Sequence, residues 1–325
     1  MISPLPALLE RIAGRRVLVV GDVILDEYLD GDATRVSPEA PVPVLRFTGQ
    51  HAVLGGAANT AANVASLGGT ATLVGLVGKD AAGDTVGRLC AEAGVRLEAL
   101  SDGRETTRKV RVISRQQQLL RIDYETTADI DASCRDRLMG VMRTLVESAD
   151  IVVVSDYAKG LLTKDVLDDV RTSAAGVRRQ VVVDPRPRHA PSYTGCDYLT
   201  PNWKEALALI GEGDTDPTPD AVRQVGGRVR DRFLAGVLLT LGARGMTFFP
   251  KDGSAPVEAA AEAREVFDVS GAGDTVVAAF ALALAGGCSP ADAVRLANRA
   301  AAVVVGKRGT ATVSPAELTG PPLFQ

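Results

Sequence analysis

The segment Asp268-Val269-Ser270-Gly271-Ala272-Gly273-Asp274-Thr275 decides the fold of this chain. The residues before it, 263–269, read as an extended segment, and residues 275–285 read as an apolar helix. Two glycines bracket a small residue at the junction. We therefore expect the chain to turn here from an extended segment directly into a helix.

The same segment also carries chemistry. The first four N–H groups of a helix lack intrahelical partners, so Gly271, Ala272 and Gly273 at the helix start predict an anion hole of backbone amides. An aspartate beside such a hole suits phosphoryl transfer, because Asp274 can take the proton from an attacking hydroxyl while the amides stabilise the moving phosphoryl group. The segment alone is equally compatible with a structural turn in which Asp274 caps the helix.

Short apolar runs alternate with amphipathic helical patterns along the rest of the chain. Strand-like runs, apolar on both faces, occur at 17–20, 71–74, 151–154, 181–183 and 237–240. Helical patterns occur at 60–67, 84–93, 135–147, 164–174 and 220–233. Strands of this kind belong inside a parallel sheet that helices cover on both faces. The rhythm predicts an α/β fold, a three-layer, doubly wound, mostly parallel sheet with right-handed crossovers.

Two stretches interrupt this rhythm. Residues 28–47 are rich in proline, glycine and charge, and residues 109–114 alternate polar with apolar side chains, the period of a half-exposed strand. Residues 117–123 can pair back with that strand. We expect a small antiparallel β lid, built from about 27–48 and 107–123, over the substrate site of a single domain that covers residues 1–325.

Composition excludes several classes of protein. The net charge of −4 and a pI near 5.4 give no reason to expect binding to nucleic acid or to anionic membranes. The four cysteines are far apart and only two histidines are present, so a structural zinc site is not expected. Neither a signal peptide nor an apolar run of membrane-spanning length is apparent, which predicts a cytoplasmic protein.

Polar residues cluster where predicted strands end. They are Asp22 and Asp26 after the first strand, Asp156, Asp184, and Asn202 after later ones. Ligands of open parallel sheets bind at the carboxyl ends of the strands, and paired carboxylates accept hydrogen bonds from sugar hydroxyls. Any one of these residues can instead be a helix cap or a turn former.

These motifs resemble a known family. The segment 268–275 looks like the C-terminal signature of the ribokinase-like (PfkB) carbohydrate kinases, and Gly55-Gly56-Ala57-Ala58-Asn59-Thr60-Ala61-Ala62-Asn63 looks like its N-terminal element. Further segments resemble the members of this family that act on a heptose 7-phosphate; they are 21–26, 37–44, 115–121, 155–160 and 304–310. The resemblance runs from about residue 16 to residue 318.

The resemblance implies an activity. It is the ATP- and Mg²⁺-dependent phosphorylation of D-glycero-beta-D-manno-heptose 7-phosphate at its anomeric hydroxyl, giving the 1,7-bisphosphate in ADP-heptose and lipopolysaccharide core precursor synthesis. It also implies a homodimer formed through the lid. Another sugar substrate within the family, or a non-catalytic sugar-phosphate sensor on the same fold, remain alternatives. A nicotinamide dehydrogenase or a P-loop kinase is disfavoured, because the third glycine of the dinucleotide motif and the Walker pattern are missing.

Site residues follow from the resemblance position by position. Asp26, Gly55, Gly56 and Asn59 match the sugar-binding elements, and Asp22, Asp156 and Asp184 join them as candidates at strand ends. The nucleotide side is expected to comprise Asn202, Trp203, Lys204, Glu205, Thr240, Gly242, Gly245 and Asn298. Glu205 would order Mg²⁺ through water, although Asn202 and Glu205 also form the pattern of a simple capping box.

A phosphate already present on the substrate needs a cation. The candidates are Arg111 and Arg121 on the lid strands, Lys159 in a strand-end loop and Arg186. Lys159 and Arg111 are the first choices, because one lies in a glycine-flanked loop and the other on the lid.

Overall fold

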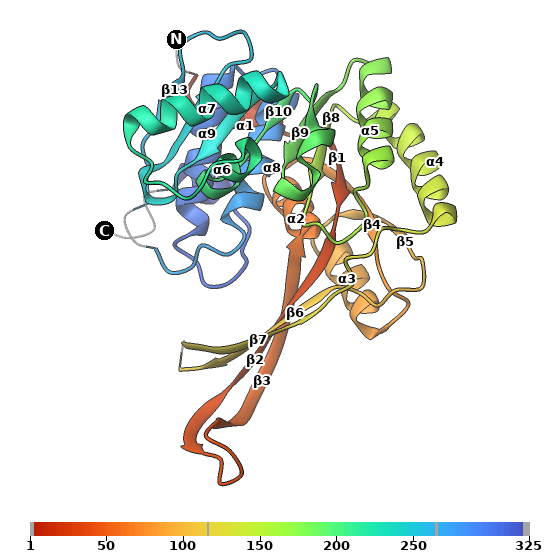
Figure 1. Cartoon of the computed structure of the whole chain (residues 1–325), viewed down its shortest axis with the longest axis vertical. Coiled ribbons are helices and arrows are strands. Elements are labelled where there is room, and N and C mark those ends of the chain that lie inside the picture. Colours follow the sequence, from red (N-terminus) through yellow and green to blue (C-terminus); the bar gives the residue numbers. More distant parts are fainter. Residues whose placement is uncertain (1–2, 116, 264–265, 321–325) are drawn as a thin grey trace.

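In the computed structural model, a nine-stranded sheet lies between two layers of helices, and a second, smaller sheet projects from one end (Figure 1). The structure describes residues 3–115, 117–263 and 266–320. The strand order of the large sheet is β13-β12-β11-β10-β9-β8-β1-β4-β5, parallel from β5 to β11 and antiparallel at β12 and β13. Its strands are β1 Arg16–Gly21, β4 Thr70–Leu76, β5 Arg96–Leu100, β8 Ile151–Ser155, β9 Gln180–Asp184, β10 Tyr198–Leu199, β11 Gly236–Thr240, β12 Met246–Phe249 and β13 Val257–Ala259.

The central strands are apolar on both faces because each face packs against its own layer of helices. In β1, Val17 and Val19 point into one core, whereas Leu18 and Val20 point into the other. The first core is closed by α1 Leu5–Ile12, α2 Ala57–Ser66, α3 Ala81–Glu92, α8 Ala272–Ala285, α9 Pro290–Val304 and α10 Pro315–Thr319. The second is closed by α4 Ala132–Ser148, α5 Lys164–Gly176, α6 Trp203–Ile210 and α7 Pro219–Phe233. The predicted three-layer, doubly wound sheet is confirmed.

The projecting sheet is the predicted lid. Its strands are β2 Val23–Val36, β3 Pro43–Gly56, β6 Arg108–Ser114 and β7 Gln117–Tyr124, in the order β3-β2-β6-β7. Both hairpins are antiparallel, and β2 runs parallel to β6 where the hairpins meet. In Figure 1 the lid extends well beyond the helical body as a long, twisted ribbon. The lid strands start at the edge of the large sheet where β1 ends. Lid residues and strand-end residues therefore share one site.

The extended segment expected ahead of α8 does not join either sheet in its described part. No strand forms in residue 263 or in residues 266–269 ahead of α8; residues 264 and 265 lie outside the described part of the chain. Backbone bonds to another segment hold this stretch instead, since Phe267 N–H donates to the carbonyl of Val305. Among the described residues, no helix combines the length and apolarity that crossing a bilayer requires.

Candidate active site

The carboxyl ends of β1, β8, β9 and β11 converge on the N-terminus of α8. This is the edge at which open parallel sheets bind ligands. Asp274 lies in the first turn of α8, and its side chain is buried in the angle between that helix and α2. Of the predicted strand-end residues, Asp184 and Asn202 line the same cavity as Asp274.

Three donors hold the Asp274 carboxylate. Asn59 Nδ2 lies 2.8 Å from Oδ2, while Thr60 Oγ1 and Tyr157 Oη lie 3.1 and 2.7 Å from Oδ1. The pKa of Tyr157 is raised well above its ordinary value, first by burial and then by the charge of Asp274, so its phenol stays protonated and acts as a donor. A carboxylate offers about four acceptor sites, which leaves Asp274 room for one more donor, such as a substrate hydroxyl.

The Asn59 amide is itself oriented by neighbours on the two helices. Asn63 Nδ2 donates to Asn59 Oδ1 at 3.1 Å, so Asn59 must present its nitrogen to Asp274. Thr275 Oγ1 donates to Asn63 Oδ1 at 3.0 Å and completes the chain. Because α2 and α8 each contribute to this network, the base is fixed by tertiary packing rather than by its own helix.

The environment places the titration of Asp274 close to neutrality. Burial raises its pKa to about 6, and the hydrogen bonds from Asn59, Tyr157 and Thr60 oppose that rise. A base whose pKa lies slightly below the working pH is ionised yet still basic enough to take a proton. Asp274 is thus suited to the role that the sequence predicts for it.

The start of α8 supplies backbone donors beside this base. Gly271 precedes the helix with a φ of 75°, in the left-handed region, and lets the chain turn sharply into it. The amide of Ala272 donates to the carbonyl of Val269 and closes the turn, so the amides of Gly273 and Asp274 are the ones that the helix start offers to an anion. Asp268 fixes the turn by accepting hydrogen bonds from the amides of Ser270 and Gly309.

A polar cavity of about 190 Å³ opens in front of this helix start. Its lining is Tyr157, Asp184, Arg186, Thr200, Asn202, Glu205, Thr240, Gly271, Gly273, Asp274 and Val276. Arg186 pairs with Glu205, and its guanidinium lies 4.7 Å from the centre of the Tyr157 ring. The pKa of Asp184 is raised well above its ordinary value, first by burial and then by the charges of Glu205 and Asp274.

The donor set of this cavity fits magnesium. Carboxylate and amide oxygens from Asp184, Glu205 and Asn202 face the cavity, and three acidic groups, Asp184, Glu205 and Asp274, share one arginine. A hard cation that keeps several water ligands would relieve this excess negative charge. Asn202 and Glu205 also form the capping box expected from sequence alone, with both reciprocal hydrogen bonds present. The structural and the functional role of the pair are therefore compatible.

A second, apolar cavity of about 300 Å³ continues from the first and shares Thr240, Gly273 and Val276 with it. Alanine, valine and glycine residues make up most of its lining, and they come from the turn after β11, from residues 261–263 and 266–269, from α8 and from the end of α9. Thr240, Gly242, Gly245 and Asn298 all border it, as expected for the nucleotide side. Trp203 and Lys204 do not: Trp203 is buried in the core with its indole N–H on the carbonyl of Thr215, and Lys204 is exposed.

On the lid side, the Asp26 carboxylate joins β2 to β6 and to the segment after α9. Its Oδ1 accepts from Arg111 NH1 at 2.7 Å, and its Oδ2 accepts from Thr310 Oγ1 at 3.3 Å. A Cβ at Gly55 would come within 2.5 Å of Asp26 Oδ2, and Gly56 turns into α2 with a φ of 55°. Glycine is therefore needed at both positions to bring β3 close to the site.

Two of the candidate carboxylates serve the protein itself. Asp22 Oδ2 accepts from the amides of Tyr157 and Lys159, which fixes the loop after β8. Asp156 is fully buried and accepts from Tyr193 Oη, while His189 Nδ1 lies 2.6 Å away; both partners lie on the 3-10 segment Pro187–Tyr193. Asp156 is absent from the lining of the polar cavity in front of α8.

The four candidate cations for a substrate phosphate are all paired. Arg111 binds Asp26, Arg121 binds Asp123, Lys159 binds Glu125, and Arg186 binds Glu205. Arg186 in addition lines the polar cavity in front of α8 rather than lying on the lid.

Sequence reasoning missed two functional contacts, those of Thr60 and Tyr157 with Asp274. Each lies inside a motif that had been noticed, Thr60 in 55–63 and Tyr157 in 155–160. The signal that could have found Thr60 is its position one residue after Asn59. Nothing in the sequence indicates that the Tyr157 hydroxyl reaches a residue 117 positions away.

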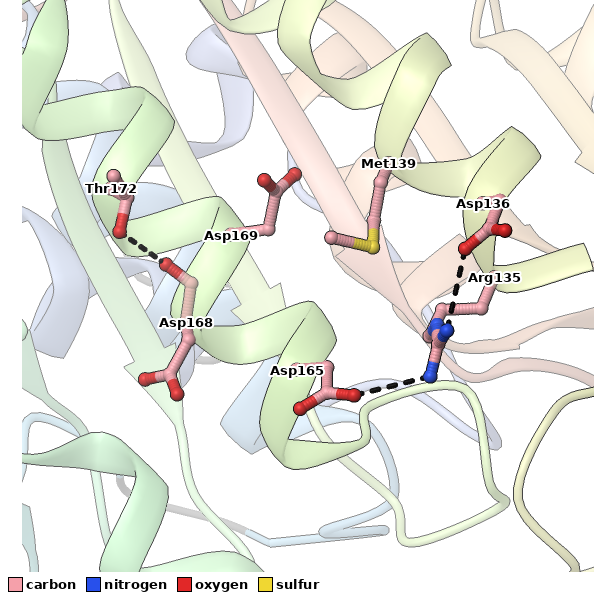
Figure 2. A pocket seen from close by; sticks show the side chains of 7 residues that line it. All are labelled: Arg135, Asp136, Met139, Asp165, Asp168, Asp169 and Thr172. Atoms are coloured by element: carbon pink, nitrogen blue, oxygen red, sulfur yellow. Dashed lines mark hydrogen bonds and ion pairs between the residues drawn. The ribbon is translucent and has the colours of Figure 1, made fainter. Parts of the chain in front are cut away.

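A further hollow lies between α4 and α5, and Figure 2 shows its lining side chains. Its charged groups are paired: Arg135 with Asp136 and Asp165, Asp168 with Lys164 and Arg171, and Asp169 with Arg143. It shares no lining residue with the two cavities at α8, so it does not belong to the active site.

Comparison with known proteins agrees with this geometry. The model of the family described as pfkB family carbohydrate kinase matches residues 15–317. A protein of Bordetella bronchiseptica named D-beta-D-heptose 7-phosphate kinase is 46% identical over 96% of this chain and 97% of its own length. The Bifunctional protein HldE of Caulobacter vibrioides is 45% identical over 94% of this chain, which spans only 63% of that relative.

Solved structures agree on the fold. Phosphofructokinase-2 from Escherichia coli superposes with a TM-score of 0.79 at 22% identity, covering 94% of this chain and 97% of the other. Ribokinase from Arabidopsis thaliana superposes with a TM-score of 0.74 at 22% identity, with the same coverage. The ribokinase-like architecture expected from the motifs is therefore confirmed, and the match of one family model to nearly the whole length shows that the chain belongs to the pfkB family of carbohydrate kinases.

Proposed function

We propose that this protein transfers the γ-phosphoryl group of ATP to the anomeric hydroxyl of D-glycero-beta-D-manno-heptose 7-phosphate. The product is the 1,7-bisphosphate, a precursor of ADP-heptose and of the lipopolysaccharide core. The observation that carries the choice of substrate is the 46% identity, over nearly the full length of both chains, to a heptose 7-phosphate kinase. The observation that carries the chemistry is Asp274 at the start of α8 beside the two connected cavities.

The geometry supports a direct transfer. The apolar cavity takes the adenine, with Asn298 at its wall, and the ATP phosphates extend into the polar cavity toward the amides of Gly273 and Asp274. The sugar lies between Asp26, Asn59 and the lid. Asp274 accepts the proton of the anomeric hydroxyl as its oxygen attacks the γ-phosphorus, and the bond from that phosphorus to the bridging oxygen of ADP breaks. The helix start stabilises the charge on the transferred group.

Magnesium and the lid complete the proposal. Asp184 and Glu205 would order a magnesium ion through water, and that ion would neutralise charge on the ATP phosphates. The lid would join two copies of the chain into a homodimer through its outer face, where Leu120, Ile122 and Tyr124 alternate along β7 and are exposed. Alternating exposed apolar residues on a sheet are typical of a surface that a partner covers.

The test is a panel of sugars assayed for ADP release, with ATP and magnesium present. We expect heptose 7-phosphate to be turned over with the highest kcat/KM, ahead of fructose 6-phosphate, ribose and unphosphorylated heptose. Preference for fructose 6-phosphate or ribose would replace the heptose assignment by another activity of the family. Binding of heptose 7-phosphate without ADP release would favour a sensor on the same fold.

A further inference from the structure

The lid carries one basic side chain that the structure leaves without a counter-ion at the active site, Lys109 on β6. Within the described residues, no carboxylate lies within ion-pairing distance of its Nζ. The two acidic groups that influence it most, Asp26 and Asp123, are already bound to Arg111 and Arg121. A half-buried ammonium without a paired anion is costly to keep in a protein.

The strand register places this ammonium on the site-facing side of the lid. Lys109 pairs with Asp26 across β2 and with Asp123 across β7, and Arg111 lies two residues further along the same strand. Because side chains alternate between the two faces of a strand, all of these residues share one face. The neighbouring Arg108 points to the opposite face, where it pairs with Glu27 and stacks on Tyr124.

Lys109 also lies next to the catalytic group. Its Nζ is 5.8 Å from the centre of the Tyr157 ring, and the hydroxyl of that ring is 2.7 Å from Asp274 Oδ1. One tyrosine side chain therefore spans the distance between the ammonium and the base. A sugar that carries its reacting hydroxyl at one end and a phosphate at the other would bridge the same two groups.

Charged groups of both signs surround Lys109. Burial lowers its pKa, and repulsion from Lys159 and Arg121 adds to that shift, whereas Asp26 and Asp123 oppose it. Lys109 lines neither of the two cavities at α8. An anion held on the lid would satisfy Lys109 and relieve the repulsion among its neighbours.

We propose that Lys109 binds the phosphate that the sugar substrate already carries, and so selects phosphorylated over free sugar. This inference rests on the proposed function and names the side chain that reads the 7-phosphate. The paired candidates Lys159 and Arg111 then act by shaping the pocket: Lys159 through its bond to Glu125, and Arg111 by orienting Asp26.

The experiment compares Lys109→Ala with the parent on heptose 7-phosphate and on the free heptose. The ratio of the two kcat/KM values should fall by about 10- to 100-fold, the effect of losing a hydrogen bond to a charged group. Most of the loss should appear in KM for the sugar phosphate. Lys109→Arg should restore much of the ratio, because it returns a cation to the same place.

The matched control is Arg108→Ala, which removes one positive charge from the same strand on the opposite face. Arg108→Ala should leave the ratio of the two kcat/KM values close to that of the parent. The two variants should have the same effect on KM for ATP. An equal loss on both sugars in Lys109→Ala, or a ratio equal to that of Arg108→Ala, would overturn the role of Lys109. The proposed function is separately refuted if the parent prefers another sugar phosphate; the Lys109 comparison is then made on that sugar phosphate and its dephosphorylated form. A parent that prefers a sugar without phosphate refutes both.

Discussion

The hydroxyl of Tyr157 donates a hydrogen bond to Oδ1 of Asp274 across 2.7 Å, joining the loop after β8 to the first turn of α8. This contact does two things at once. It stabilises the ionised form of a buried base, and it fixes the carboxylate in one orientation relative to the helix start. Tyr157 is therefore a positioning residue for Asp274.

Replacing Tyr157 by phenylalanine should move the pH profile in a defined direction. The Tyr157 hydrogen bond lowers the pKa of Asp274, which burial has raised to about 6, so its loss should raise that pKa further. Since the base works only when ionised, the acidic limb of log kcat/KM should shift to higher pH in Tyr157→Phe. A profile that keeps its position while the overall rate changes would mean that the hydroxyl acts only on geometry.

The role of Asp274 itself is tested by Asp274→Asn. This change keeps the shape of the side chain but removes the proton acceptor, so kcat should fall by about 10²-fold or more. Binding of ATP, measured by calorimetry, should persist because the cavities remain. Turnover within a few-fold of the parent would remove Asp274 from the mechanism.

Glu205→Gln addresses the proposed magnesium contact. The concentration of magnesium that gives half the maximal rate should rise more than KM for the sugar, because a neutral amide orders the waters of a cation less well. The chain offers a matched control in Glu317, which occupies the same position of the capping box at α10 and pairs with Lys307. Glu317→Gln should leave the magnesium titration unchanged; equal curves for the two variants would make Glu205 a capping residue only.

The turn before α8 depends on glycine at position 271. An alanine there would adopt an unfavourable left-handed conformation, which costs about 1–2 kcal/mol. Its Cβ would also lie 2.6 Å from Asn59 Nδ2, the donor that holds Asp274. We therefore expect Gly271→Ala to lose both stability, measured by thermal unfolding, and kcat. Gly14→Ala is the control, because Gly14 has a similar φ of 69° but open space around it; it should lose stability alone.

The lid is expected to mediate a homodimer, and its outer face identifies the residues to change. Val110 of β6 is buried within the chain, whereas Leu120 and Ile122 of β7 are 54% and 38% exposed. The double change Leu120→Ser, Ile122→Ser should lower the mass measured by light scattering from dimer to monomer. Leu234→Ser, at an equally exposed leucine beyond α7, should not. A parent protein that is monomeric at micromolar concentration would refute the dimer.

The sequence by itself determined the architecture and the location of the chemistry. Runs such as 151–154 and 181–183 are apolar throughout, so they had to be covered on both faces, and that condition fixes a helix-covered parallel sheet. The period of two along 109–114 determined a half-exposed strand, and with it the lid. The glycines around Asp274 are local requirements of a turn and a helix start, so eight consecutive residues marked that start, and the proposal of Asp274 as the base needed the family resemblance in addition.

The tertiary structure alone decided which charged groups are available. A sequence shows that Lys159, Arg111 and Lys109 are cations. Whether each of them forms an ion pair depends on how close it lies to carboxylates on other elements. The partner of Arg111, Asp26, lies 85 residues away, and its approach depends on the pairing of β2 with β6. Tertiary contacts likewise decided the partners of Asp156, and burial decided the raised pKa of Asp274. Ion pairing and desolvation arise from contacts between elements, whereas sequence periodicity describes only the faces of one element. This is why the fold could be predicted from the sequence and the proposed phosphate-binding side chain could not.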